Sequence, residues 1–115
     1  MTLNTLLNKN LAGISFKRNG DNYIPAHFKA GYFVSLTNNE IIDQDRLDII
    51  GEIERLAFIL SLKNFFFGYW KDNETEKEYL DLSLHKTSKQ EAIILARQFN
   101  QRAIFDCYKL NSIYI

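Results

Sequence analysis

The sequence predicts an α+β domain in which an antiparallel sheet of about five strands is covered on one face by two helices, in the element order ββαββαβ. Two patterns predict this fold. Residues 79–85 alternate between polar and apolar side chains, as a half-buried strand does. Apolar residues recur at three- and four-residue spacing over residues 47–60, as on an amphipathic helix. The length of 115 residues and the hydrophobic fraction of 46% fit a single domain spanning residues 1–115.

The N-terminal part of the chain contains two predicted strands. Residues 1–12 carry leucines at near-helical spacing and are expected to form a short helix or a docking arm. Residues 13–18 and 31–37 have the composition of strands. The segment between them contains Pro25 and little periodicity, so we expect an irregular connection there.

The first long helix is expected to begin after an acidic cap and to run to about Leu62. Asp43 or Asp45 can cap it, because a short carboxylate accepts hydrogen bonds from the free amides of the first turn. The predicted buried stripe consists of Leu47, Ile49, Ile50, Ile53, Leu56, Ala57 and Leu60. Gly51 interrupts this helix at a cost of about 1 kcal/mol relative to alanine, which suggests that something approaches the helix closely there.

A hairpin, a helix and a final strand are predicted for the C-terminal half. Residues 65–70 and 79–85 are expected to pair as antiparallel strands around a polar tip. In the second of these strands the leucines should face the core, and the other face should be polar and solvated, with Tyr79, Asp81, Ser83 and His85 on it. Ser88 and Glu91 form a capping box for a helix over residues 89–100, and residues 102–108 return as a strand.

Motifs for catalysis, metal binding or nucleotide binding are not recognisable, so a nonenzymatic protein without metal or cofactor is expected. One cysteine and two histidines cannot supply a structural zinc site, and Cys107 is expected to pack as a small hydrophobe. Asp81 and His85 share a strand face but lie about 13 Å apart, too far for a direct general-base pair. A small enzyme with a site assembled from His27, His85 and dispersed carboxylates is the weaker alternative.

Two surfaces are candidates for binding a protein partner. The tyrosines and the tryptophan exceed what a small core accommodates, and Tyr69, Trp70 and Tyr79 are candidates for an exposed aromatic sheet face. Residues 40–55 hold six acidic residues against two arginines, and Asp45, Asp48 and Glu52 are candidates for an acidic helix face. The ordinary alternatives are core packing for the aromatic residues and a solvated helix face for the acidic ones.

Charge and hydropathy limit the other partners. The formal net charge of zero disfavours tight binding to nucleic acid. The N-terminal part is nevertheless mildly basic, with Lys9, Lys17, Arg18 and Lys29, so a nucleic-acid-binding accessory protein is the alternative function. A signal peptide and an apolar stretch of 18 residues are absent, so a cytoplasmic protein without membrane contact is expected. A homodimer formed by pairing of edge strands is a further expectation.

Several local patterns carry a resemblance to known proteins. They are GYFVSL at residues 31–36, YLDLS at 79–83, NQRAIFD at 100–106 and an aromatic-Gly-x-Trp segment at 67–70. Together they make the chain resemble a loose group of small uncharacterised proteins from bacteria, phages and other mobile elements. The resemblance supplies no active-site residues. It implies a setting in which small proteins with an acidic face sometimes inhibit host defence by occupying a nuclease or its guide-bound complex, in the manner of anti-CRISPR or anti-restriction proteins.

Overall fold

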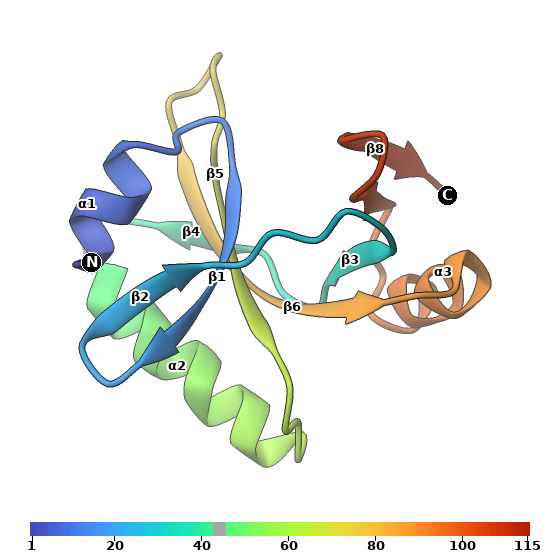
Figure 1. Ribbon diagram of the computed structural model, residues 1–115, viewed down its shortest axis with the longest axis horizontal. Coiled ribbons are helices and arrows are strands. Elements are labelled where there is room, and N and C mark those ends of the chain that lie inside the picture. Colours follow the sequence, from blue (N-terminus) through green and yellow to red (C-terminus); the bar gives the residue numbers. More distant parts are fainter. Residues whose placement is uncertain (43–45) are drawn as a thin grey trace.

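The computed structural model describes residues 1–42 and 46–115, which form three helices and one eight-stranded antiparallel sheet (Figure 1). The elements in chain order are α1 (Leu3–Asn8), β1 (Ile14–Asn19), β2 (Asn22–Pro25), β3 (Tyr32–Ser35), β4 (Asn39–Ile41), α2 (Arg46–Ile59), β5 (Phe66–Lys71), β6 (Glu78–Lys86), α3 (Lys89–Gln98), β7 (Ala103–Asp106) and β8 (Asn111–Tyr114). The α+β class and the antiparallel sheet are therefore confirmed.

The predicted number of strands and their order are wrong. Strands β2, β4 and β8 were not expected, and each has only three or four residues. Segments this short show too little alternation to stand out in a sequence, and they become strands because a longer neighbour offers them hydrogen-bonding partners. The leucine-rich segment at the N-terminus is a helix, α1, which is one of the two expectations for residues 1–12, so the described residues form three helices where the predicted element order had two.

Strand β6 is the centre of the sheet. The strand order is β2-β1-β5-β6-β3-β7-β8, and β4 pairs with the part of β6 that β3 leaves free. The predicted hairpin of β5 and β6 is confirmed by six paired positions from Phe66 to Lys71. Between the pairs Ser35–Ser83 and Asn39–Leu80, three residues oppose two, which is a β-bulge. The Thr37 hydroxyl accepts the Leu82 amide at 2.9 Å there and replaces a backbone acceptor.

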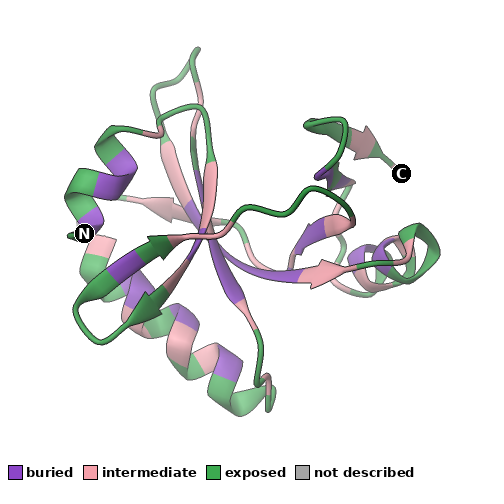
Figure 2. Cartoon of the chain, in the orientation of Figure 1, coloured by how far each residue is buried: buried purple, intermediate pink, exposed green. Residues whose placement is uncertain are grey.

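One face of the sheet and all three helices form the main hydrophobic core (Figure 2). The leucines of β6 lie on this face, as alternation predicted, and they are buried. Thr2 caps α1 and Ser88 caps α3, each by accepting a backbone amide of the first turn. The core side chains from the helices are Leu3, Leu6 and Leu7 of α1, Ile49, Ile50, Ile53 and Ala57 of α2, and Ala92 and Ala96 of α3.

The predicted buried stripe of α2 is partly wrong. The isoleucines and Ala57 are buried as expected, but Leu47 is 66% exposed and Leu60 is 39% exposed. At about 100° per residue, Leu47 lies roughly 120° around the helix from Ile53 and roughly 160° from Ile49, so it falls outside the stripe that those residues form. The expected cap at Asp43 or Asp45 lies outside the described residues.

Gly31 is required by a close approach of strand β6, and its replacement by alanine should be strongly destabilising. Its φ is +84°, and a Cβ atom there would lie 2.5 Å from Nε2 of His85 and 2.8 Å from the Lys86 carbonyl oxygen. Gly20 also has a positive φ, of +60°, but a Cβ atom placed on it would have no atom of the described chain within 4 Å. We expect Gly31→Ala to lower the free energy of unfolding by roughly 2–4 kcal/mol.

Denaturant unfolding of Gly31→Ala beside Gly20→Ala measures this prediction. The Gly20 variant carries only the cost of a side chain at positive φ, about 1 kcal/mol. Equal losses for the two variants would show that the approach of His85 does not constrain position 31.

Candidate functional site

The face of the sheet opposite the helices carries an open groove of about 920 Å³. Its floor comes from the central strands, with Ser35, Gly68, Asp81 and Ser83. Its walls come from residues 10–15, from the β2–β3 connection at residues 26–28, from Trp70 and from the strands β7 and β8. Segments that are distant in the sequence therefore meet around one hollow.

Asp81 at the floor of this groove is buried, which contradicts the predicted solvated face of β6. Asp81 is 4% exposed and Ser83 is 2% exposed. The reason is that neighbouring strands flank β6 on both sides and the wall segments rise above it. Oδ2 of Asp81 accepts a long hydrogen bond of 3.4 Å from the Ser35 hydroxyl, whereas Oδ1 has no hydrogen-bond partner within residues 1–42 and 46–115.

Burial raises the pKa of the Asp81 carboxyl from 3.8 to about 7. Hydrogen bonding from the Asn39 backbone and from the side chains of Ser35 and Trp70 opposes this rise without cancelling it. The carboxyl is thus protonated in mildly acidic solution and ionised in mildly alkaline solution. A group that changes charge near neutral pH in a hollow is typical of functional sites.

The three aromatic candidates do not form one exposed face. Tyr69 is 2% exposed and lies in the helix-side core, so the expectation that it lies on the aromatic sheet face is wrong. Alternation places Trp70 on the groove face, where its ring stacks on that of Tyr79 with a centroid distance of 4.5 Å and an interplanar angle of 18°. Trp70 and Tyr79 therefore form a partly exposed pair beside the groove.

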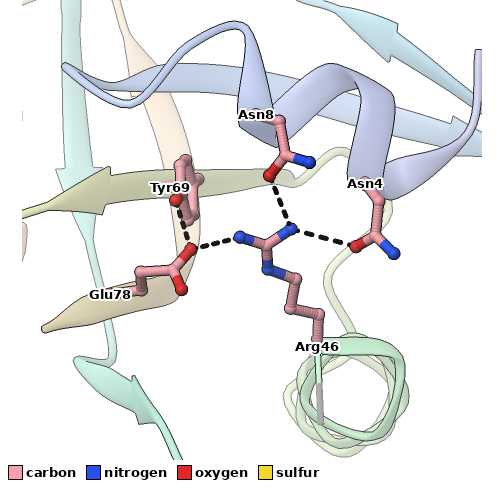
Figure 3. Close-up of polar contacts among 5 residues, drawn as sticks. All are labelled: Asn4, Asn8, Arg46, Tyr69 and Glu78. Atoms are coloured by element: carbon pink, nitrogen blue, oxygen red, sulfur yellow. Dashed lines mark hydrogen bonds and ion pairs between the residues drawn. The ribbon is translucent and has the colours of Figure 1, made fainter. Parts of the chain in front are cut away.

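Tyr69 belongs to a polar network that joins α1, α2 and the β5–β6 hairpin (Figure 3). The guanidinium of Arg46 donates to Oδ1 of Asn4 at 3.0 Å and to Oδ1 of Asn8 at 3.2 Å. Arg46 and the Tyr69 hydroxyl both donate to Oε1 of Glu78. All five side chains have a partner in this network, which indicates a structural role.

The network shifts two pKa values in opposite directions. Burial and the Glu78 carboxylate raise the pKa of Tyr69 well above its usual range. Burial alone would raise the pKa of Glu78, but the hydrogen bonds from Tyr69 and Arg46 outweigh it and lower the pKa below 4.5. At neutral pH the tyrosine is therefore neutral, the glutamate is ionised, and the ion pair with Arg46 is intact.

The acidic helix candidates border an apolar stripe on the outer side of α2. Asp48 and Glu52 are exposed as predicted, and Asp45 lies outside the described residues. Phe58 is 84% exposed and Ile59 is 73% exposed. We define the α2 outer surface by the exposed or half-exposed residues Leu47, Asp48, Gly51, Glu52, Glu54, Arg55, Phe58 and Ile59. Green segments along α2 in Figure 2 mark its exposed residues.

Gly51 leaves a hollow in the α2 outer surface. Residues Gly51, Glu54, Arg55, Phe58 and Ile59 line a shallow depression of about 470 Å³. Apart from its chain neighbours and the backbone of α2 itself, the only atom of the described chain within 4 Å of a Cβ placed on Gly51 is Nη1 of Arg55, at 3.9 Å. The close approach that the sequence suggested at Gly51 is therefore not made by the described residues.

His85, Cys107 and two of the four basic candidates are occupied in packing or pairing, whereas His27 lines the groove. His85 stacks on Phe28 with a centroid distance of 3.8 Å, and its Nε2 lies 2.9 Å from the Ala30 carbonyl oxygen. Cys107 is buried as expected, and burial raises the pKa of its thiol. Lys17 lies over the Phe66 ring at 4.7 Å, and Arg18 is paired with Glu54 at 2.6 Å, so these two cations are not arranged as a nucleic-acid surface.

Within residues 1–42 and 46–115, no group of three histidine, cysteine, aspartate or glutamate side chains could hold a metal ion. None of the helices in that part of the chain is long and apolar enough to cross a membrane. No family model, curated protein or solved structure matches this chain. The groove and the α2 outer surface are therefore the features from which a function can be inferred.

The groove, the position of Asp81 in it and the exposure of Phe58 were not predicted from the sequence. One signal was present for Asp81, because an aspartate stands at the centre of a leucine-rich strand. A signal was also present for the α2 outer surface, because the apolar residues at 58–60 (FIL) continue the apolar run around the helix.

Proposed function

We propose that the chain is a nonenzymatic protein-binding module that contacts its partner through the α2 outer surface. The observation that carries this proposal is the exposure of Phe58 beside the hollow at Gly51. Exposed apolar patches of this kind mark interaction sites, and full burial of a phenylalanine side chain stabilises a complex by about 2 kcal/mol.

The shape and charge of the surface define the partner's chemistry. The hollow at Gly51 accepts an apolar side chain from the partner, because a glycine lets the two backbones approach closely. Asp48 and Glu52 lie beside the stripe and favour lysine or arginine around the partner's apolar contact. We therefore expect a partner with an apolar contact surrounded by basic side chains.

The sequence resemblance extends this proposal to a biological setting. Small proteins of phages and mobile elements act on host proteins, and nucleases carry basic surfaces because they bind phosphates. A nuclease or another nucleic-acid-bound protein of a bacterial defence system has the charge that Asp48 and Glu52 require. We propose that the chain binds such a protein in the bacterial cytoplasm.

Replacing Phe58 by serine should remove the partner without unfolding the protein. We expect at least a roughly tenfold loss of the copurified partner, because a central aromatic contact is worth more than about 1.4 kcal/mol. The free energy of unfolding should change by less than about 0.5 kcal/mol, since Phe58 is exposed. The measurement is quantitative mass spectrometry of proteins that copurify with the tagged chain from a bacterial lysate treated with nuclease.

Ile94→Ser is the matched control, because Ile94 is an exposed apolar residue on α3, at 51% exposure. This variant should retain the partner. Retention of the partner by Phe58→Ser would contradict the proposal. Recovery of nucleic acid alone from untreated lysate would favour the nucleic-acid-binding alternative, and recovery of a pure homo-oligomer would place another copy of the chain on this surface.

A further inference from the structure

The floor of the groove contains a buried hydrogen-bond acceptor without a donor. Asp81 is 4% exposed, and its Oδ1 has no hydrogen-bond partner among the described residues. An ionised carboxylate only accepts hydrogen bonds. The bond from Ser35 to Oδ2 is long, at 3.4 Å, and the hydrogen bonding from the Asn39 backbone and the Trp70 side chain leaves Oδ1 without a partner. A molecule that enters the groove is therefore recognised best if it donates hydrogen bonds.

The charge at this position selects among the donors. A buried carboxylate is costly unless a cation neutralises it. Among the described residues, the ion pairs are Arg18 with Glu54, Arg46 with Glu78 and Lys77 with Glu40, and none of them involves Asp81. His27 and Arg102 line the groove, but neither is paired with Asp81. Since none of the cations in the described part of the chain is paired with Asp81, a cationic ligand would supply the missing charge.

The walls and the size of the groove define the remainder of the ligand. Phe33, Trp70, Phe105 and Tyr114 line it, and aromatic rings favour both apolar contact and a nearby cation. The volume of about 920 Å³ is in the range of small-molecule sites. Gly68 keeps the floor clear, because a Cβ atom there would lie 3.0 Å from Oγ of Ser83 and 3.9 Å from Cβ of Asp81.

We propose that this groove binds a small organic cation, in which an amidinium, guanidinium or primary ammonium group donates hydrogen bonds to Asp81 and a flat apolar body lies against the aromatic walls. Ser35 and Ser83 lie beside the carboxylate and supply hydroxyl groups for a second polar contact. This site is separate from the proposed partner surface, because α2 packs on the opposite face of the sheet.

Benzamidine and benzamide are a matched pair of probes for this proposal, since they differ in the charge and donors of one planar group. We would titrate each into the isotopically labelled protein at about pH 8, where Asp81 is ionised, and follow the amide signals and the Trp70 indole signal by NMR. Benzamidine should shift the signals of Gly68, Asp81 and the Trp70 indole. Benzamide should bind at least roughly tenfold more weakly, because it lacks the charge-assisted bonds to the carboxylate.

Two groove variants and one control variant make the test specific. Asp81→Asn should weaken benzamidine binding at least roughly tenfold, and Asp21→Asn in the exposed β1–β2 turn should leave it unchanged. Trp70→Leu provides a second variant at a partly exposed position and should weaken binding severalfold. Equal binding of the two probes, unchanged binding to folded Asp81→Asn, or no shift of the groove signals by millimolar benzamidine would overturn the proposal. Because the partner assay uses Phe58, failure of either proposal leaves the other intact.

Discussion

Asp81→Asn should make the protein more stable in mildly alkaline solution. It should also abolish the part of the pH dependence of the unfolding free energy that comes from Asp81. Burial raises the pKa of Asp81 from 3.8 to about 7, so the folded state holds a proton that the unfolded state has released between these values. The free energy of unfolding therefore falls as pH rises through this interval. The shift corresponds to a loss of up to roughly 4 kcal/mol at pH values above 7. Asparagine does not ionise and avoids this loss.

The measurement is the difference in unfolding free energy between the variant and the wild type, from denaturant titrations at several pH values between about 4 and 8. The variant should gain stability relative to the wild type as pH rises. Asp21→Asn is the control, because Asp21 is an exposed aspartate in the β1–β2 turn and this change should give a flat difference. A flat difference for Asp81→Asn would show that the carboxyl is not buried as the structure has it.

Arg46→Ala should be among the most destabilising single changes of a polar side chain. It removes the donor that connects Asn4, Asn8 and Glu78, and it leaves the partly buried Glu78 carboxylate, whose side chain is 22% exposed, without its cation. Breaking a buried pair on one side costs several kcal/mol, so we expect a loss of roughly 2–4 kcal/mol at neutral pH. Tyr69→Phe, which removes one hydrogen bond to Glu78, should cost about 1 kcal/mol.

The pH dependence of the Arg46→Ala effect has a defined sign. The pKa of Glu78 is below 4.5 in the folded state, so its contribution to stability is present above that value and is lost as pH falls through the lowered pKa. The cost of Arg46→Ala should accordingly shrink in acid. Arg55→Ala on the same helix is the control, because Arg55 is exposed and should cost less than about 0.5 kcal/mol. Equal costs for the two arginines would contradict the structural role of the network.

The sequence allowed the long elements to be predicted, because their patterns are local. The alternation in β6 identified a strand and separated its leucines from Asp81 and Ser83. Alternation divides a strand into two sets of residues, but it does not reveal which other segments cover the second set. Here the β2–β3 connection and the β7–β8 hairpin cover the face of β6 that carries Asp81 and Ser83. The positions of these two segments depend on pairing between distant strands. The burial of Asp81 could therefore not be predicted from a local pattern.

Local periodicity accounts for more of the candidate surface on α2. Helical periodicity predicted the helix and its buried isoleucines, and it predicted the exposure of Asp48 and Glu52. Phe58 lies roughly 140° around the helix from Ile53 and roughly 180° from Ile49, so a residue type that is usually buried is exposed here by its place on the helix. Tyr69 shows the opposite error, since a residue type common at interfaces is buried here by its place on the core face of β5.

The most direct test of the protein-binding function is photo-crosslinking from position 58 in living bacteria. A photoreactive phenylalanine analogue at position 58 should form a crosslink to one defined host protein, and the same analogue at position 94 on α3 should not. We expect this crosslink because Phe58 is 84% exposed on the α2 outer surface. The absence of a crosslink at position 58, the same products from both positions, or a crosslink only between two copies of the chain would contradict the proposed function.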